Sequence, residues 1–161
     1  MRRTASTDRA PVPAGPYSQV AASGRIVAAA GQVGRRPDGT LLKGIEAQTH
    51  QAIDNLFAVL DAGGASPDDV VSVRVFLTDV DHFSIVNAIY ASRWNEPYPA
   101  RTTVYVGLGR GLLVEIDALA VVLHGASLGI QMQWQIDPET VDLERTLAWF
   151  TQTCRSLLSS A

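Results

Sequence analysis

The chain has 161 residues, of which 47% are hydrophobic and 18% are charged, which suits one globular domain and excludes a disordered chain or two full catalytic domains. Thirteen basic and sixteen acidic residues give a net charge of −3, which disfavours nucleic acid as the main partner because few phosphates would be neutralised. The single cysteine, Cys154, excludes an internal disulfide and a thiolate metal cluster. We therefore expect a reducing, cytoplasmic setting, and the absence of a long apolar run predicts no membrane partner.

The first half of the chain predicts a lead-in, two strands and a helix. Residues 1–16 are polar and contain three prolines near their end, so we expect an irregular segment. A short strand is expected over 17–22, and the apolar run 25–32 predicts a buried strand. Apolar residues then recur every three or four positions between Gly44 and Gly63, which predicts an amphipathic helix. Its expected buried face consists of Ile45, Ala52, Ile53, Leu56, Phe57 and Leu60.

The second half predicts a strand, a helix and a final pair of strands. Alternating valines over 70–77 indicate a strand, and a helix is expected over 81–94. Strands over 101–108 and 112–123 follow, and the glycine-rich segment 107–111 predicts a hairpin between them. The expected buried side of the second helix consists of Phe83, Val86, Ile89, Tyr90 and Trp94.

This order of elements predicts the fold class. Strands and helices in this sequence form an α/β fold with a mixed sheet and two helices on one face, because each helix has only one apolar side to bury. The last strand is apolar without interruption from Ala118 to Leu123, so we expect both of its faces to be covered. We infer an oligomer in which the sheet faces close together.

Residues 125–161 differ in composition from residues 1–124 and predict a C-terminal extension to a first domain. Asp137 and Pro138 are typical of the start of a helix. The following apolar stripe, suited to docking on the core or on a partner, consists of Leu143, Leu147, Phe150, Cys154 and Leu157. A stabilising element, a cap on the oligomer, a cover for the cleft and a docking site for a partner all remain open.

Two charged residues on the last two strands are the strongest candidates for chemistry. Alternation places Arg101, Thr103 and Tyr105 on one strand face, and the planar fork of arginine suits a carboxylate or phosphate. A structural salt bridge is the alternative. Glu115 lies inside an apolar strand, where a carboxylate is either paired with a charge or shifted in pKa for proton transfer. The predicted hairpin brings Arg101 and Glu115 close enough to share one small, charged ligand.

The other polar patterns favour structural interpretations. No two histidines have metal-ligand spacing, so no metal is expected. His50 and Asp54 share a helix face and are expected to form a solvated pair. The glycines of 107–111 precede a strand and not a helix, which favours a turn over a phosphate loop.

Several segments together resemble the Rid/YjgF family of reactive-intermediate deaminases over about residues 10–123. They are the residues 15–19 (GPYSQ), 30–32 (AGQ), Gln48, 54–56 (DNL), 70–90 (VVSVRVFLTDVDHFSIVNAIY), 99–106 (PARTTVYV) and 114–121 (VEIDALAV). The resemblance implies a chorismate-mutase-like subunit that forms a homotrimer with three ligand clefts at the subunit boundaries. It also implies hydrolysis of 2-imino acids or enamines to 2-keto acids and ammonia without a cofactor.

The resemblance assigns a role to five residues of this chain. Arg101 resembles the arginine that holds the substrate carboxylate, and Glu115 resembles the glutamate that positions the attacking water. Tyr17 matches a tyrosine that lines the cleft. Asn87 matches a cleft asparagine, and the backbone of Gly31 is expected beside the bound ligand.

Two positions depart from the family pattern and keep other functions open. Thr103, a predicted substrate-binding residue, stands where the archetypal deaminases often have cysteine, and Ala30 stands where they often have serine. A noncatalytic module that binds small carboxylates is therefore one alternative, and a deaminase for a larger imine is another. RNA cleavage ranks behind both, because the pI is about 5.5 and no basic aromatic stripe is present.

Overall fold

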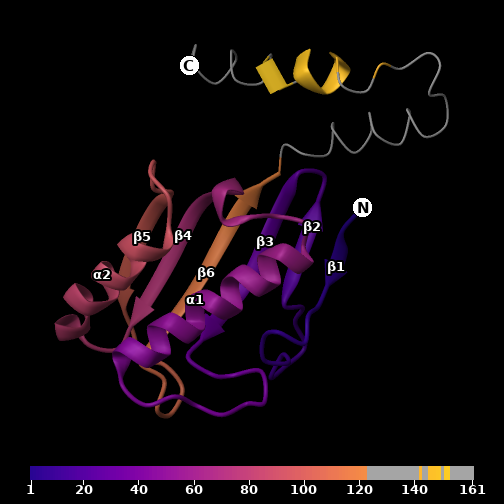
Figure 1. The fold of residues 1–161 in the computed structure, drawn as a ribbon. Coiled ribbons are helices and arrows are strands. Elements are labelled where there is room, and N and C mark those ends of the chain that lie inside the picture. The colour runs from indigo at the N-terminus through magenta and orange to yellow at the C-terminus, as the bar shows by residue number, and fades with distance from the viewer. Residues whose placement is uncertain (123–141, 143–144, 150, 153–161) are drawn as a thin grey trace. The chain divides into compact units, whose positions relative to one another are not determined.

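The computed structural model describes residues 1–122, 142, 145–149 and 151–152, and the chain forms two compact units, Met1–Val122 and Leu123–Ala161. The first unit is a six-stranded sheet with α1 (Ile45–Ala62) and α2 (Phe83–Arg93) on one face (Figure 1). The strands are β1 (Arg3–Ala5), β2 (Val20–Ser23), β3 (Ile26–Val33), β4 (Val70–Leu77), β5 (Ala100–Tyr105) and β6 (Val114–Val121). Short 3-10 turns at Pro67–Asp69 and Val80–His82 precede β4 and α2. The predicted α/β class is confirmed.

The strand order is β1-β2-β3-β6-β4-β5, and the sheet is mixed, as predicted. β4 and β5 run parallel, whereas every other neighbouring pair is antiparallel. The hairpin expected between 101–108 and 112–123 is wrong, because β6 pairs with β3 and β4 and does not pair with β5. The helix between β4 and β5 returns the chain to the same end of the sheet, so β5 joins β4 as a parallel crossover. β6 then fills the gap between β3 and β4.

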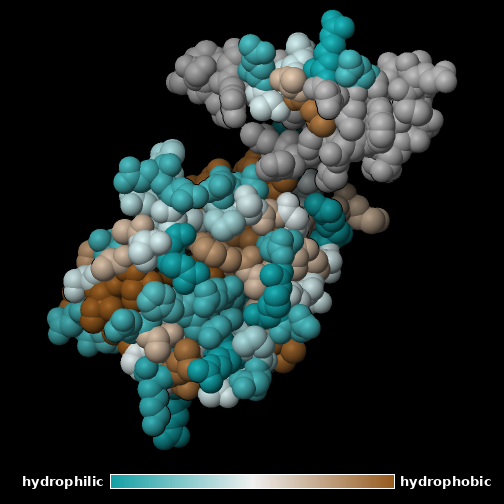
Figure 2. Space-filling view, viewed as in Figure 1, coloured by the Kyte–Doolittle hydropathy of each residue, from teal (hydrophilic) through white to brown (hydrophobic). Residues whose placement is uncertain are grey.

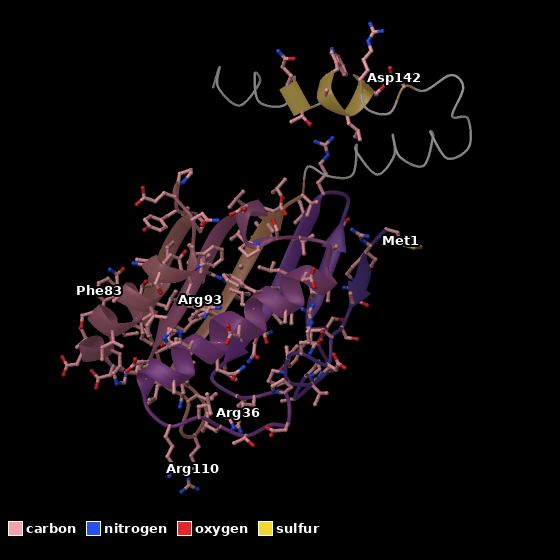
Figure 3. All side chains as sticks on the ribbon, in the orientation of Figure 1. Met1, Arg36, Phe83, Arg93, Arg110 and Asp142 are labelled. Atoms are coloured by element: carbon pink, nitrogen blue, oxygen red, sulfur yellow. The ribbon has the colours of Figure 1, made fainter. Side chains whose placement is uncertain are left out.

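The core lies between the sheet and the two helices. The predicted face of α1 is buried, with Ile53, Leu56 and Leu60 completely enclosed and Phe57 partly so. On α2, the predicted inner side is buried except for Phe83, which is 40% exposed. Phe83 is the first residue of this helix, and Figure 3 labels it there. The surface in Figure 2 is accordingly hydrophobic over α2, where Phe83 and Ile85 are exposed.

The N-terminal segment differs from the expected irregular lead-in. β1 lies within it and pairs antiparallel with β2, Arg3 opposite Ala22. β1 has three residues, and of these only Ala5 packs against the core. A strand this short and polar has no apolar alternation, so the sequence pattern does not predict it. The following strand begins at Val20 and not at Tyr17.

On the sheet face opposite the helices, apolar side chains are exposed in the first unit as the structure describes it. Ile26, Val104 and Leu119 alternate with helix-facing residues and are 52%, 37% and 40% exposed. The expectation that the last strand is covered on both faces is therefore not met within the described residues of the first unit.

The described part of the second unit is helical at 145–149 and 151–152. The Oδ1 of Asp142 accepts a hydrogen bond from the backbone N–H of Arg145 at 3.0 Å, which is the bond of an N-cap. Asp137, Pro138 and most of the predicted apolar stripe lie outside the described residues; Leu147 is within them. In the described portion of the chain, no helix is both long and apolar enough to cross a membrane.

Candidate functional site

All predicted site residues except Thr103 border one of two separate cavities of the first unit. The first, the Glu115 cavity, has a volume of about 590 Å³ and is bordered by Tyr17, Gly31 and Glu115. The second, the Arg101 cavity, has a volume of about 300 Å³ and is bordered by Asn87, Tyr90 and Arg101.

Three residues of α2 contact Arg101: Asn87, Tyr90 and Phe83, whose ring centroid lies 5.9 Å from the guanidinium carbon. The Nη2 of Arg101 donates a hydrogen bond to Oδ1 of Asn87 at 2.8 Å, and its guanidinium carbon lies 4.6 Å from the centroid of the Tyr90 ring. Burial raises the pKa of Tyr90 to about 12, against the opposing effect of the Arg101 charge. Within the described residues, no carboxylate lies within 4 Å of Arg101. The salt-bridge alternative is therefore wrong for this part of the chain, and most of the guanidinium donors remain free for an anion.

Glu115 lines the first cavity. Burial, and to a smaller extent the charge of Asp117, raise the pKa of Glu115 above its ordinary value of 4.5. Its Oε1 passes so close to Gly31 that a Cβ at that position would lie 1.9 Å away. Gly31 is therefore required for the place that the Glu115 side chain occupies.

The N-terminal segment forms a wall of the Glu115 cavity and is fixed by a residue to which the sequence assigned no role. Gln19 is 3% exposed. Its amide donates to the carbonyl of Pro11 at 2.8 Å and accepts from the backbone N–H of Thr7 at 2.7 Å. The hydroxyl of Tyr17 accepts from the N–H of Ala14 at 3.1 Å. Gln19 was visible in the sequence only as a member of the motif 15–19.

One chain does not bring Arg101 and Glu115 together. Residues paired across neighbouring strands point to the same face of a sheet. Arg101 pairs with Val73, which is buried under the helices, so Arg101 faces the helices. Glu115 pairs with Phe76 and faces the opposite side of the sheet. β4 separates the two strands. Thr103 shares the face of Arg101, as predicted, but borders neither cavity.

Asp54 lies outside the two cavities, and the potential metal ligands form no cluster among the described residues. Asp54 forms an ion pair with Arg93 of α2 at 2.5 Å, so the expected solvated pair with His50 is wrong. Across the described residues, no group of three potential ligands is arranged to hold a metal ion.

Two glycines near the Glu115 cavity provide a matched pair of substitutions. In Gly31→Ala the new methyl displaces the flexible end of Glu115, and we expect a smaller loss of stability than in Gly34→Ala, because a side-chain end can move without the backbone. In Gly34→Ala the methyl meets the Cα of Gln48 at 2.5 Å, where the backbone must move, and we expect a loss of about 1–3 kcal/mol of stability. Urea denaturation is measured on both variants. Equal stability losses in the two variants would contradict this assignment.

Comparison with known proteins identifies the family. A family model described as Endoribonuclease L-PSP matches residues 7–122. A RutC family protein of Pyrococcus horikoshii is 41% identical over 123 residues, which cover 74% of this chain and 98% of that protein. A protein of Escherichia coli named 2-iminobutanoate/2-iminopropanoate deaminase is 35% identical over 126 residues, 75% of this chain and 98% of that one.

Solved structures agree with these sequence relatives. The crystal structure of RidA from an Antarctic Psychrobacter has a TM-score of 0.73 and 38% identity, and the match covers 74% of this chain and 99% of that chain. The mixed sheet with its two helices is thus the fold of RidA. The chain belongs to the Rid/YjgF family, as the sequence motifs predicted. Some members of this family are named imine deaminases, and others are named only as RutC proteins or endoribonucleases.

Proposed function

We propose that this protein hydrolyses 2-imino acids to 2-keto acids and ammonia. The observation that carries the proposal is Arg101, a half-buried guanidinium held by Asn87 and Tyr90 and free of any described carboxylate partner. A planar cation fixed in this way suits the carboxylate that every 2-imino acid carries. The relative from Escherichia coli, named as a deaminase of such compounds, supports the same substrate class.

The complete cleft, in this proposal, forms between two subunits of a homotrimer. Arg101 and Glu115 face opposite sides of the sheet, so a second chain is needed to place both beside one ligand. The apolar face that includes Ile26, Val104 and Leu119 supports association, since soluble proteins rarely leave such a face uncovered. A cyclic trimer repeats one heterologous contact three times and gives three equal clefts.

The proposed reaction is the addition of water to a carbon that is already electrophilic. Glu115 accepts a proton from water as the water oxygen bonds to C2 of the protonated imine, and the C=N π electrons pass to nitrogen. The proton on Glu115 is then given to the amine nitrogen. The C–N bond breaks as the hydroxyl oxygen forms the C=O bond, Glu115 takes the hydroxyl proton, and the leaving ammonia accepts that proton as ammonium. One water is consumed, and one 2-keto acid and one ammonium ion are formed. No cofactor takes part, and holding the reactants together is the main catalytic contribution.

This role for Glu115 predicts how turnover depends on pH. The carboxylate acts as a base only when unprotonated, so kcat rises with pH through the pKa of Glu115. Because burial and Asp117 raise that pKa, the rise is expected above pH 4.5. Glu115→Gln should remove the rise and lower kcat about a hundredfold. Asp117→Asn removes the second cause of the raised pKa and should move the rise to lower pH; a rise that stays in Glu115→Gln would exclude Glu115 as the base.

The reaction itself is tested by competition with a chemical trap. An amino-acid oxidase generates the imine in situ, semicarbazide traps it, and the enzyme competes by releasing the 2-keto acid. We expect the wild-type protein to suppress trapping of the imines formed from small amino acids. No suppression for small or large imines, combined with binding of small carboxylates by calorimetry, would replace the proposal with a noncatalytic carboxylate-binding module.

The proposal does not include RNA cleavage, and it does not depend on where in the cell the protein is found. Although the family model is described as an endoribonuclease, the net charge of −3 is unfavourable for binding a polyanion. Location in the cytoplasm stays a prediction from the single cysteine.

A further inference from the structure

A second arginine borders the Glu115 cavity. Arg35 follows β3, is half-buried and is part of the wall that also includes Leu112 and Glu115. Its Nη1 donates one hydrogen bond to the carbonyl of Gly39 at 2.9 Å. Among the described residues, no carboxylate lies within 4 Å of Arg35. A cation that is partly removed from water without a counterion is expected to attract an anion.

The backbone at Arg35 is anchored on α1. The amide of Asn55, a completely buried residue, donates to the carbonyls of Val33 at 3.0 Å and Arg35 at 2.8 Å. Arg35 also forms a β-bridge with Leu41. The guanidinium therefore extends from a fixed point, which reduces the entropy lost when it binds a ligand.

Arg35 does not serve as the counterion of Glu115. Burial and Asp117 account for the raised pKa of Glu115, and both raise it, whereas a nearby guanidinium would lower it. The two groups are thus separate points on the wall of one cavity of about 590 Å³. In a single chain, before a neighbouring subunit closes the cleft, that volume is larger than a three-carbon imino acid. Prolines at positions 11 and 13 form an apolar part of the same wall, which strengthens a charge interaction inside it.

We propose that Arg35 binds a second acidic group of the substrate, so that the cleft prefers 2-imino dicarboxylic acids to 2-imino acids with apolar side chains. The inference rests on the proposed function, in which Arg101 of a neighbouring subunit holds the first carboxylate and Glu115 activates the water. Arg35 then binds the far end of the side chain and determines specificity without taking part in the chemistry.

The test compares two imines in the full-length protein. Imines of aspartate and alanine are generated by oxidases and trapped with semicarbazide, and kcat/KM is measured for wild type, Arg35→Gln and Arg36→Gln. Arg36 is the matched control, because it is the next residue, carries the same charge, is exposed and does not border the cavity; Figure 3 labels it on the loop after β3. We expect wild type to prefer the aspartate imine about tenfold, the contribution of one charge-assisted contact.

The variants separate the possible results. Arg35→Gln should lose the preference and keep activity on the alanine imine, Arg36→Gln should keep both, and Arg35→Lys should retain part of the preference. Calorimetry without turnover should give the same order: oxaloacetate binds wild type more tightly than Arg35→Gln, and pyruvate binds both equally. Equal losses on both imines, or no change on either, would overturn the role of Arg35 and leave the proposed function standing. Hydrolysis of neither imine by wild type would overturn both.

Discussion

Arg101→Ala is expected to lower kcat/KM for 2-imino acids about a thousandfold. A carboxylate held by the guanidinium fork receives two charge-assisted hydrogen bonds, each worth about 1.5–3 kcal/mol, and about 1.4 kcal/mol corresponds to a tenfold change in rate. Arg101 is on the edge strand β5 and makes one side-chain hydrogen bond, to Asn87. The fold should therefore tolerate its loss. Turnover in the semicarbazide assay and the urea midpoint are measured together.

Two further variants show whether charge alone explains the effect. Arg101→Lys keeps the charge and loses the fork, so we expect it to recover only part of the activity. Asn87→Ala removes the side chain that orients the guanidinium through the 2.8 Å hydrogen bond, and KM should rise severalfold with a smaller change in kcat. Full activity in Arg101→Ala would contradict the assignment of the carboxylate site.

Gln48→Leu is expected to destabilise the first unit by about 3 kcal/mol or more. Gln48 is 1% exposed, and its Nε2 donates to the carbonyls of Leu42 and Gly111, both at 2.9 Å. Its Oε1 accepts from the N–H of Leu113 at 2.8 Å. Leucine leaves three backbone groups without these partners, each at a cost of about 1–3 kcal/mol where water does not replace the bond. Urea denaturation at one protein concentration measures the difference, because association of subunits makes stability depend on concentration.

Gln51→Leu is the matched control on the same helix. Gln51 is partly buried and donates one hydrogen bond, to Oδ1 of Asn55 at 3.0 Å. Its loss should cost about 1 kcal/mol or less. Turnover should also fall in Gln48→Leu alone, because Leu112, next to one of its partners, borders the Glu115 cavity. Gln48 joins the loop before α1, at Leu42, to the loop before β6, at Gly111 and Leu113. Similar stability losses for both variants would contradict this role of Gln48.

The sequence predicted most elements because the spacing of apolar residues along each helix or strand shows which face is buried. The apolar spacing of 44–63 and the alternation of 70–77 correspond closely to α1 and β4. It did not predict β1, because a short polar edge strand has no apolar periodicity. It also misplaced β6, since the length of the loop after β5 suggests a hairpin and contains no information on the gap left between β3 and β4.

The candidate site was predicted residue by residue and not as an arrangement. Family motifs identified Tyr17, Gly31 and Glu115, which the fold brings to one cavity, and Asn87 and Arg101, which it brings to another. That these groups face opposite sides of the sheet follows from strand order, which local patterns do not encode. Arg35 gave no signal either, because a lone arginine in a polar loop resembles any solvated residue until the cavity beside it is known.

Complementation between two inactive variants is the most direct test of the central claim that neighbouring subunits share each cleft. Arg101→Ala and Glu115→Gln subunits are mixed in equal amounts, unfolded together and refolded. In a cyclic trimer every mixed assembly contains one cleft with both native residues, so activity should return to about a quarter of wild type. The variants refolded separately and then combined without exchange should remain inactive. Wild-type trap suppression with no recovery in the refolded mixture would contradict the shared cleft.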